Sequence, residues 1–368
     1  MPQPSLGILT LYLNDKKQLE ERQIYQKMIV EGQKLGLDIF VFTPMDVHKN
    51  KDMIWALIYN PSTKKWSRKW QKFPQLIFDR CRIQKSKRFE QLKVFRARYR
   101  DKLFLNRPLR DKWTIHQTLS QKSKFRPFLP QTKLFLNINN VLEMLQEHQV
   151  VYVKPINGTG GRGILRIEKL SPNQYRIQGR KPSRQIIPER KVSLVQLKSY
   201  LLHWRGDKRF LVQQGIQIKL PNGRVHDYRM LVQKNGNGKW QVTGCAGRMG
   251  PERSVTSNLH GGGKAIPMDT LLKEWKFSEL KREQIRTTAE QLSLEIAAYL
   301  EDTYEALCEL ALDLGIDRQG RIYLIEVNPK PARQVFLQSG DTEAYQQAIR
   351  RPLEYALWVY KQNNTASS

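Results

Sequence analysis

A glycine-rich loop with a preceding lysine lies mid-chain, between residues 150–156 and 164–167, which are apolar and predict β-strands. Glycine has no side chain, so the backbone N–H groups of such a loop can approach phosphate oxygens closely. Lys154 ends the first strand, where its ammonium group would neutralise phosphate charge. The loop residues are Gly158, Thr159, Gly160, Gly161 and Gly163. This pattern predicts a phosphate-binding flap, with an ordinary glycine-rich hairpin and a solvated lysine as the alternative.

The spacing of Gly158, Gly160 and Gly163 also matches the G-x-G-x-x-G fingerprint of dinucleotide-binding proteins. That motif must open a helix, whereas the residues after Gly163 are apolar, partly β-branched and predict a strand. A Walker A loop is excluded as well, because no Gly-Lys followed by Ser or Thr is present there.

Two apolar strands near the C-terminal end flank a tight turn, and each carries an acidic residue. Pairing Ile316 with Arg321 across the turn places Asp313 opposite Leu324. Side chains alternate along a strand, so Glu326 then lies on the same face as Asp313, as its diagonal neighbour. We therefore expect the two carboxylates to lie close together.

Asn328 adds an amide oxygen to the face that carries Asp313 and Glu326. Carboxylates in apolar strands are costly to bury unless they are paired or bound to a cation. Two carboxylates and an amide oxygen suit one or two Mg²⁺ ions that bridge to phosphates. Ion pairs with Lys or Arg are the alternative, although Asn328 would add nothing to them.

The elements that would position these groups divide the chain into two parts and a tail. Apolar strands at residues 6–12 and 37–42 surround a helical pattern at 18–35, which predicts a small parallel sheet. We therefore expect an α+β protein with an N-terminal α/β domain over residues 1–107. The second domain spans residues 108–362, with a flap subdomain at about 132–212, and residues 363–368 form a polar tail.

The chain has a formal net charge of +29, which implies attraction to polyanions such as nucleotide phosphates, nucleic acid, acidic peptides or an acidic cell-surface polymer. Residues 80–102 are strongly basic, but no zinc-finger, helix-turn-helix or RNA-recognition signature surrounds them. A solvated helix face is therefore favoured over a nucleic-acid site, which stays open as an alternative. The basic segment at 176–209 is expected at the cleft mouth, where it would attract an acidic substrate.

No run approaches the roughly 18 apolar residues that a membrane-spanning helix needs. The N-terminal residues show no positively charged leader and no cleavage site, so we expect a cytoplasmic protein. Cys81, Cys245 and Cys308 are widely separated and show no metal-ligand spacing. They predict reduced thiols without a chemical role.

The glycine loop and the carboxylate hairpin, in this order, resemble the ATP-grasp superfamily of D-alanine–D-alanine ligase and glutathione synthetase. The resemblance implies an ATP-grasp fold behind a pre-ATP-grasp domain, and ATP and Mg²⁺ as cofactors. It implies that Lys154 contacts the nucleotide phosphates beneath the loop. Asp313, Glu326 and Asn328 match the metal-binding positions of the superfamily.

Further positions take roles from the same resemblance. It implies that Lys112 is an earlier nucleotide lysine and that a hinge receives adenine through its backbone. The hinge residues are Gln213, Gln214 and Ile216. It also implies that Arg229 and Arg248 face phosphate or an acyl phosphate, with Asn258 near the substrate. The chain departs from the superfamily where an acidic hinge residue usually holds the ribose.

At closer range, residues 157–164, 238–244 and 313–317 resemble the YheC/YheD-like endospore coat-associated proteins, most specifically between residues 112 and 333. The resemblance implies a role in bacterial spore formation and association with the spore coat. The expected activity is carboxylate–amine ligation through an acyl phosphate, acting on an acidic peptide or a cell-wall-related carboxylate. A non-catalytic ATP-binding coat or assembly protein is the alternative. The oligomeric state is left open.

Overall fold

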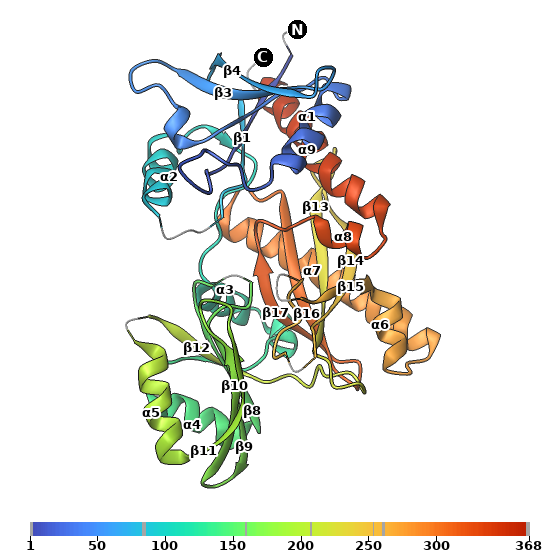
Figure 1. Cartoon of the computed structure of the whole chain (residues 1–368). Coiled ribbons are helices and arrows are strands. Elements are labelled where there is room, and N and C mark those ends of the chain that lie inside the picture. The colour runs from blue at the N-terminus through green and yellow to red at the C-terminus, as the bar shows by residue number, and fades with distance from the viewer. Residues whose placement is uncertain are drawn as a thin grey trace.

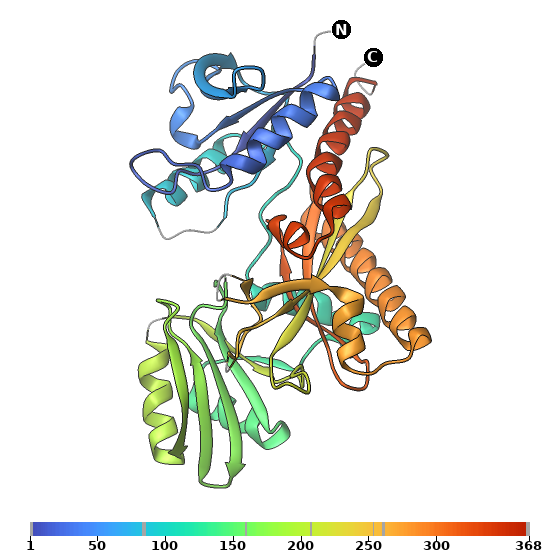
Figure 2. The same ribbon diagram turned by 45° about the vertical axis from the view of Figure 1, so that its right-hand side comes forward.

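The computed structural model describes residues 3–82, 86–158, 160–206, 208–252, 254–259 and 262–365. In this part of the chain, helices and strands form three sheets with their covering helices (Figure 1). Figures 1 and 2 show an N-terminal lobe at the top, a second lobe at the bottom and a central sheet that joins them.

The N-terminal lobe is built on a six-stranded sheet of order β4-β3-β2-β1-β5-β6. Its strands are β1 (Ser5–Leu9), β2 (Asp38–Phe42), β3 (Met53–Asn60), β4 (Lys65–Lys72), β5 (Leu76–Asp79) and β6 (Leu103–Phe104). Its helices are α1 (Arg22–Lys34), the 3-10 turn η1 (Pro44–Asp46) and α2 (Lys87–Arg98). β1 pairs in parallel with β2 and β5, as the alternation of strand and helix predicts. β3 and β4 form an antiparallel hairpin at one edge.

The second lobe, called the flap lobe, contains an antiparallel sheet of order β11-β10-β9-β8-β12-β7. Its strands are β7 (Thr132–Leu134), β8 (Val150–Pro155), β9 (Ile164–Ser171), β10 (Gln174–Arg180), β11 (Ile186–Ser193) and β12 (Phe210–Gln214). The helices α4 (Ile138–Glu147) and α5 (Leu194–Arg205) share a core with one face of this sheet. Val151 and Val153 point into that core, so the alternate residues of β8 face the other way.

The central sheet has the order β15-β14-β13-β16-β17 and is antiparallel. Its strands are β13 (His226–Lys234), β14 (Trp240–Met249), β15 (Lys264–Pro267), β16 (Glu309–Ile316) and β17 (Ile322–Asn328). The helices around it are α3 (Lys112–Ser120), η2 (Ser123–Phe128), α6 (Met268–Glu274), α7 (Glu279–Tyr304), α8 (Gln334–Gln338) and α9 (Thr342–Thr365). α7 shares one core with β13 and β16.

α9 connects the central sheet to the N-terminal lobe. Tyr345, Ile349 and Leu353 of α9 belong to the same buried cluster as Ile8 of β1 and Met28 of α1. Figure 2 shows α9 running from the central sheet along the N-terminal lobe. The helix continues to Thr365, three residues into the segment for which a polar tail is expected. Within the described ranges, no helix is long and apolar enough to cross a membrane.

Candidate functional site

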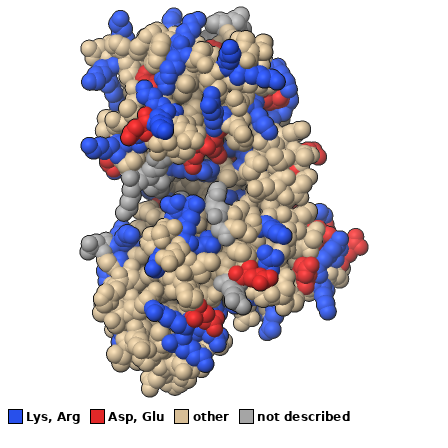
Figure 3. All heavy atoms as spheres, viewed as in Figure 1, with Lys and Arg blue, Asp and Glu red and all other residues tan. Residues whose placement is uncertain are grey.

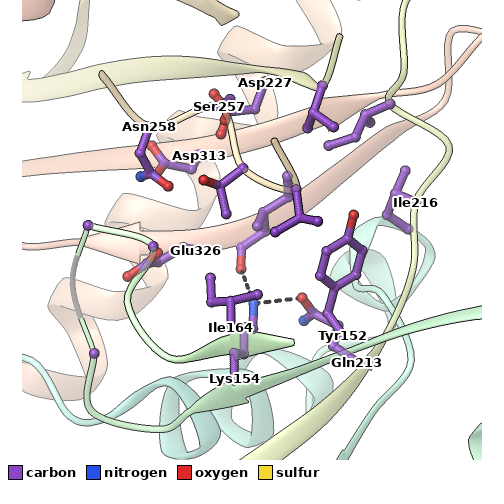
Figure 4. A pocket seen from close by; sticks show the side chains of 18 of the residues that line it. Tyr152, Lys154, Ile164, Gln213, Ile216, Asp227, Ser257, Asn258, Asp313 and Glu326 are labelled. Carbon is purple, nitrogen blue, oxygen red and sulfur yellow. Dashed lines mark hydrogen bonds between the residues drawn. The ribbon is translucent and has the colours of Figure 1, made fainter. Parts of the chain in front are cut away.

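A cavity of about 120 Å³, called the first cavity, lies between the flap lobe and the central sheet (Figure 4). It brings together twelve of the predicted site residues: Lys112, Lys154, Gly158, Gly160, Gly161, Gln213, Gln214, Ile216, Arg248, Asn258, Asp313 and Glu326. Gly163 and Asn328 line an adjoining second cavity, and Arg229 reaches the site through Asp313. Thr159 lies outside the described residues.

Lys154 projects from β8 into the first cavity. It is opposite Leu211 of β12, on the face of the flap sheet that α4 and α5 do not cover. Its Nζ donates to Gln213 Oε1 at 2.7 Å and to the backbone oxygen of Ile325 at 3.4 Å (Figure 4). Burial lowers the pKa of Lys154 to about 8; Glu326 opposes this shift and Lys112 adds to it. An incoming anion would therefore meet a poorly solvated cation.

Lys112 joins the glycine loop to β17. The carboxylate of Asp111 accepts the backbone N–H groups of Trp113 and Thr114, which caps α3 and places Lys112 in its first turn. The Nζ of Lys112 donates to the backbone oxygen of Gly158 and lies 3.2 Å from Glu326 Oε1. A second cation thus stands beside Lys154 at the cavity.

The glycine loop lies against Asn258, which belongs to the segment between β14 and β15. Gly161 has a φ of +70°, a conformation that residues with a side chain rarely adopt. A Cβ atom at Gly161 would lie 2.5 Å from Asn258 Oδ1, a contact too short for real Cβ atoms. Glycine at this position therefore allows the loop to touch Asn258 across the cavity.

Asp313 of β16 and Glu326 of β17 are directly paired, so the predicted diagonal arrangement is wrong. Ile316 pairs with Ile322 and not with Arg321, and a β-bulge follows between Leu324 and Glu326. The bulge adds one residue, Ile325, to β17 and brings Glu326 opposite Asp313.

Asp313 accepts hydrogen bonds from three side chains. Arg229 binds it through Nε and Nη2, both at 2.9 Å, and Arg248 Nη2 lies 2.9 Å from its Oδ2. Asn328 Nδ2 donates to the same Oδ2 at 3.2 Å, which puts Asn328 on the predicted face. Burial opposes the charge of Asp313, but the two guanidinium groups lower its pKa to about 2. Asp313 is therefore a carboxylate at neutral pH.

The oxygen donors fit a magnesium ion that also binds phosphate. Within the described ranges, no three His, Cys, Asp or Glu side chains cluster as a metal cage. Mg²⁺, however, is usually held by one or two carboxylates together with substrate phosphates. Asp313 and Glu326 stand side by side, with Asn328 bonded to the first. The metal role of these three residues stays a prediction.

The chain matches the family model described as YheC/D-like ATP-grasp over residues 101–359. The chain belongs to this ATP-grasp family. It is similar to the endospore coat-associated protein YheC of Bacillus subtilis (strain 168), with 25% identity over 97% of this chain and 98% of that protein. YheD of the same organism is 24% identical over 97% of this chain and 79% of that protein. The predicted family is confirmed.

Solved structures confirm the predicted α+β ATP-grasp fold. The D-cycloserine synthetase DcsG superimposes with a TM-score of 0.56 at 11% identity, covering 97% of this chain and 99% of that one. The macrocyclase MdnC, bound with precursor peptide MdnA from Microcystis aeruginosa MRC, gives a TM-score of 0.52 at 14% identity. That match covers 94% of this chain and 97% of MdnC. At such identities the likeness concerns the fold alone.

One end of the first cavity in this ATP-grasp protein is apolar. Its apolar lining includes Tyr152, Ile164, Ile218, Val225 and Ile325, and Figure 4 shows Tyr152 close to the hinge residue Ile216. Sequence analysis missed these five residues as parts of the site. Alternation predicts that Ile325 points away from Glu326, and the bulge that turns it toward the cavity leaves no sequence signal.

The basic segment at residues 176–209 lies only partly at the two cavities. Arg190 and Lys191 lie on β11, which is separated from β8 by β10 and β9. Lys208 and Arg209, by contrast, line the second cavity. The expected position at the cleft mouth is therefore wrong for Arg190 and Lys191, because β11 is the outer edge of the flap sheet.

Proposed function

We propose that this ATP-grasp protein binds Mg·ATP in the first cavity and acts as a carboxylate–amine ligase in bacterial spore formation. The observation that supports this most is the gathering of cations and oxygen donors around one cavity. Lys112, Lys154 and Arg248 face Asp313 and Glu326 there. The two lysines suit the phosphates of a triphosphate, Arg248 is held beside them by Asp227 and Asp313, and the paired carboxylates suit the metal that accompanies ATP.

In the proposed reaction, a substrate carboxylate oxygen attacks the γ-phosphorus of ATP, and the bond to the β,γ-bridging oxygen breaks to release ADP. The nitrogen of an amine then attacks the acyl carbon, and inorganic phosphate leaves with the acyl C–O bond electrons. The amine proton goes to solvent. No protein nucleophile is required, so the residues act by positioning and by neutralising charge.

Each group of residues has a distinct part in this proposal. Lys154 and Lys112 would hold phosphate oxygens beneath the glycine loop, and Arg248 would face the transferred phosphoryl group. Asp313, Glu326 and Asn328 would hold Mg²⁺, which withdraws charge from the phosphates when it is bound. Closure of the loop onto Asn258 would exclude water, which otherwise hydrolyses an acyl phosphate.

The biological setting is proposed from the relatives. YheC and YheD are named as endospore coat-associated proteins, and each match spans 97% of this chain. A structural neighbour, MdnC, is a macrocyclase bound with a precursor peptide. The peptide-bound neighbour supports a peptide substrate, and the formal net charge of +29 favours an acidic one, with a cell-wall-related carboxylate as the other candidate.

The test is calorimetric titration of ATP with and without Mg²⁺, on the wild type and on the double variant Glu326→Gln with Asn328→Ala. We expect Mg²⁺-dependent binding in the wild type and its loss in the variant. The matched control is Glu283→Gln with Asn364→Ala, because both residues are exposed on helices remote from the cavity. A folded wild type that does not bind ATP would refute the proposal.

Turnover is tested separately by the release of ADP and phosphate in the presence of acidic peptides and an amine. ATP binding without turnover on any such acceptor would instead support a non-catalytic ATP-binding role in coat assembly.

A further inference from the structure

The second cavity, of about 940 Å³, continues from the first toward α3. The two cavities share the wall residues Lys112, Lys154, Pro155, Gly158, Arg162, Gln213, Ile325 and Glu326. Asn328 lines the second cavity but not the first. A molecule in the second cavity would therefore lie next to the groups proposed to hold Mg²⁺ and phosphate.

Three cations line the second cavity beyond the shared wall. Arg110, Lys208 and Arg209 are exposed, and none has an ion-pair or hydrogen-bond partner for its side chain in the part of the chain described. Among the described residues, Asp111 is the acidic residue that lines the second cavity beyond the shared wall, and its carboxylate accepts backbone N–H groups of α3. These three positive charges are thus available to an anion other than the nucleotide.

The floor of the second cavity is apolar. Its partly exposed residues are Leu129, Ile325 and Val327, and its buried residues are Leu109, Ile115, Leu119, Phe210, Leu211 and Leu324. Ile115 and Leu119 stand four residues apart on α3 and so lie on one face of that helix. An inorganic anion would leave this floor against water, whereas a ligand with an apolar segment would cover it.

The molecular surface is hollowed between the lobes (Figure 3). Figure 3 shows a hollow between the N-terminal lobe and the lower part of the molecule, with Lys and Arg side chains at its border.

We propose that the second cavity binds the carboxylate substrate, an acid with an apolar segment and a second negative group. Its reacting carboxylate would lie near Glu326 and Asn328, its apolar segment over the floor and its second negative group against Arg110, Lys208 and Arg209. This assignment rests on the proposed ligase function. It makes the three cations determinants of substrate specificity and not of ATP binding.

The experiment compares the triple variant Arg110→Gln, Lys208→Gln, Arg209→Gln with a control that loses the same charge elsewhere. The control carries Arg190→Gln, Lys191→Gln and Lys198→Gln, which lie on β11 and α5 and line neither cavity. Each protein, saturated with Mg·ADP at constant ionic strength, is titrated with four probes. The probes are acetyl-Glu-Leu-Glu, acetyl-Glu-Ser-Glu, uncharged acetyl-Gln-Leu-Gln-amide and N-octanoyl-glutamate.

We expect the wild type and the control to bind acetyl-Glu-Leu-Glu more tightly than the serine or uncharged probes. The triple variant should bind acetyl-Glu-Leu-Glu at least about tenfold more weakly, because each substitution removes a charge-assisted contact. If N-octanoyl-glutamate also binds tightly, an acyl chain with two carboxylates is sufficient for binding. If it does not bind, the cavity requires a peptide. Either result supports the assignment.

The assignment would be overturned if the control variant bound acetyl-Glu-Leu-Glu as weakly as the triple variant, or if the triple variant bound it as tightly as the wild type. So would a failure of all four probes to bind a wild type that binds Mg·ADP. ATP titrations of the same three proteins report on the proposed function independently, because ATP affinity should agree among them within about threefold.

Discussion

Lys154 holds its charge in an environment that does not favour it. Its side chain is 8% exposed, and its amine contacts an amide oxygen and a backbone oxygen rather than a carboxylate. Burial of this charge lowers the free energy of unfolding of the ligand-free protein. A bound triphosphate would supply the negative charge that the ammonium group lacks, and two consequences can be measured.

The first consequence is a pH dependence of ATP binding. The pKa of Lys154 is lowered by burial to about 8, and bound phosphate would raise it again. The protein should therefore take up protons when ATP binds near pH 8. The affinity for ATP should fall as the pH rises from 7 to 9. Calorimetry in buffers of different ionisation enthalpy measures this uptake. A proton uptake that survives in Lys154→Met would assign it to another group.

The second consequence concerns stability. The pKa of Lys154 in the folded protein lies below the ordinary lysine value of 10.5, so the unfolded chain binds this proton more tightly. The contribution of Lys154 to the free energy of unfolding therefore rises as the pH increases from 8 to 10.5. Near pH 7, Lys154→Met should raise the free energy of unfolding by about 1–3 kcal/mol. The same variant should lose ATP affinity. Urea denaturation checks the gain, with the exposed Lys198→Met expected to change little.

At the scale of elements, the loop between β8 and β9 and the pair β16–β17 form the two sides of the site. Their strands follow from the alternation of apolar residues, and the glycine spacing follows from the need for backbone N–H groups at the cavity. The β8–β9 loop contacts the central lobe at Gly161 without any side chain between them. That close approach can be tested by adding one methyl group.

Gly161→Ala should weaken ATP binding by at least about fivefold, because its methyl group clashes with Asn258 and the backbone is strained. Gly223→Ala is the matched control, since Gly223 has a φ of +78° but open space around its Cβ position. The control should lose only about 1 kcal/mol of stability and keep its ATP affinity. Equal ATP affinity in both variants would show that the contact with Asn258 is unimportant for binding.

Most of the site elements could be predicted from the sequence, because local patterns determine them. The glycine loop, the apolar strands and the shared face of Asp313 and Asn328 are examples. The bulge at Ile325 could not, because inserting one residue into a ladder depends on packing that strand periodicity does not encode. Consequently Ile325 was missed as a residue that lines the cavity.

Arg80 shows a second limit of sequence analysis. It belongs to a basic stretch for which a solvated face is favoured, yet its side chain is buried. Its partner Glu309 is 229 residues away in the sequence, and no local pattern indicates such a pairing. The contact depends on how the N-terminal lobe sits on the central sheet.

At the scale of the whole molecule, a buried cluster of charges joins the N-terminal lobe to the central sheet. Arg80 contacts Glu309 of β16, Glu21 at 2.7 Å and the backbone oxygen of Pro331 at 3.0 Å. Arg333 also binds Glu309, at 2.6 Å. Charges without solvent depend on their partners, so the lobes are coupled through this cluster.

Glu309→Gln should therefore destabilise the protein by about 3–5 kcal/mol, because it leaves Arg80 and Arg333 buried with one carboxylate fewer. Urea denaturation followed by tryptophan fluorescence measures the loss. Glu283→Gln removes an exposed ion pair with Arg286 and should cost no more than about 1 kcal/mol. Similar losses in both variants would argue that the buried cluster contributes nothing specific.

The position of α9 has a consequence for the protein during its synthesis. α1 and β1 leave the ribosome long before α9, but the apolar surface they share is covered by Tyr345, Ile349 and Leu353 of that helix. For most of translation, the nascent N-terminal lobe must therefore expose Met28 and its neighbours to the cytosol or to a chaperone. A translational stall before α9 would leave an incompletely folded, aggregation-prone product rather than a folded N-terminal domain.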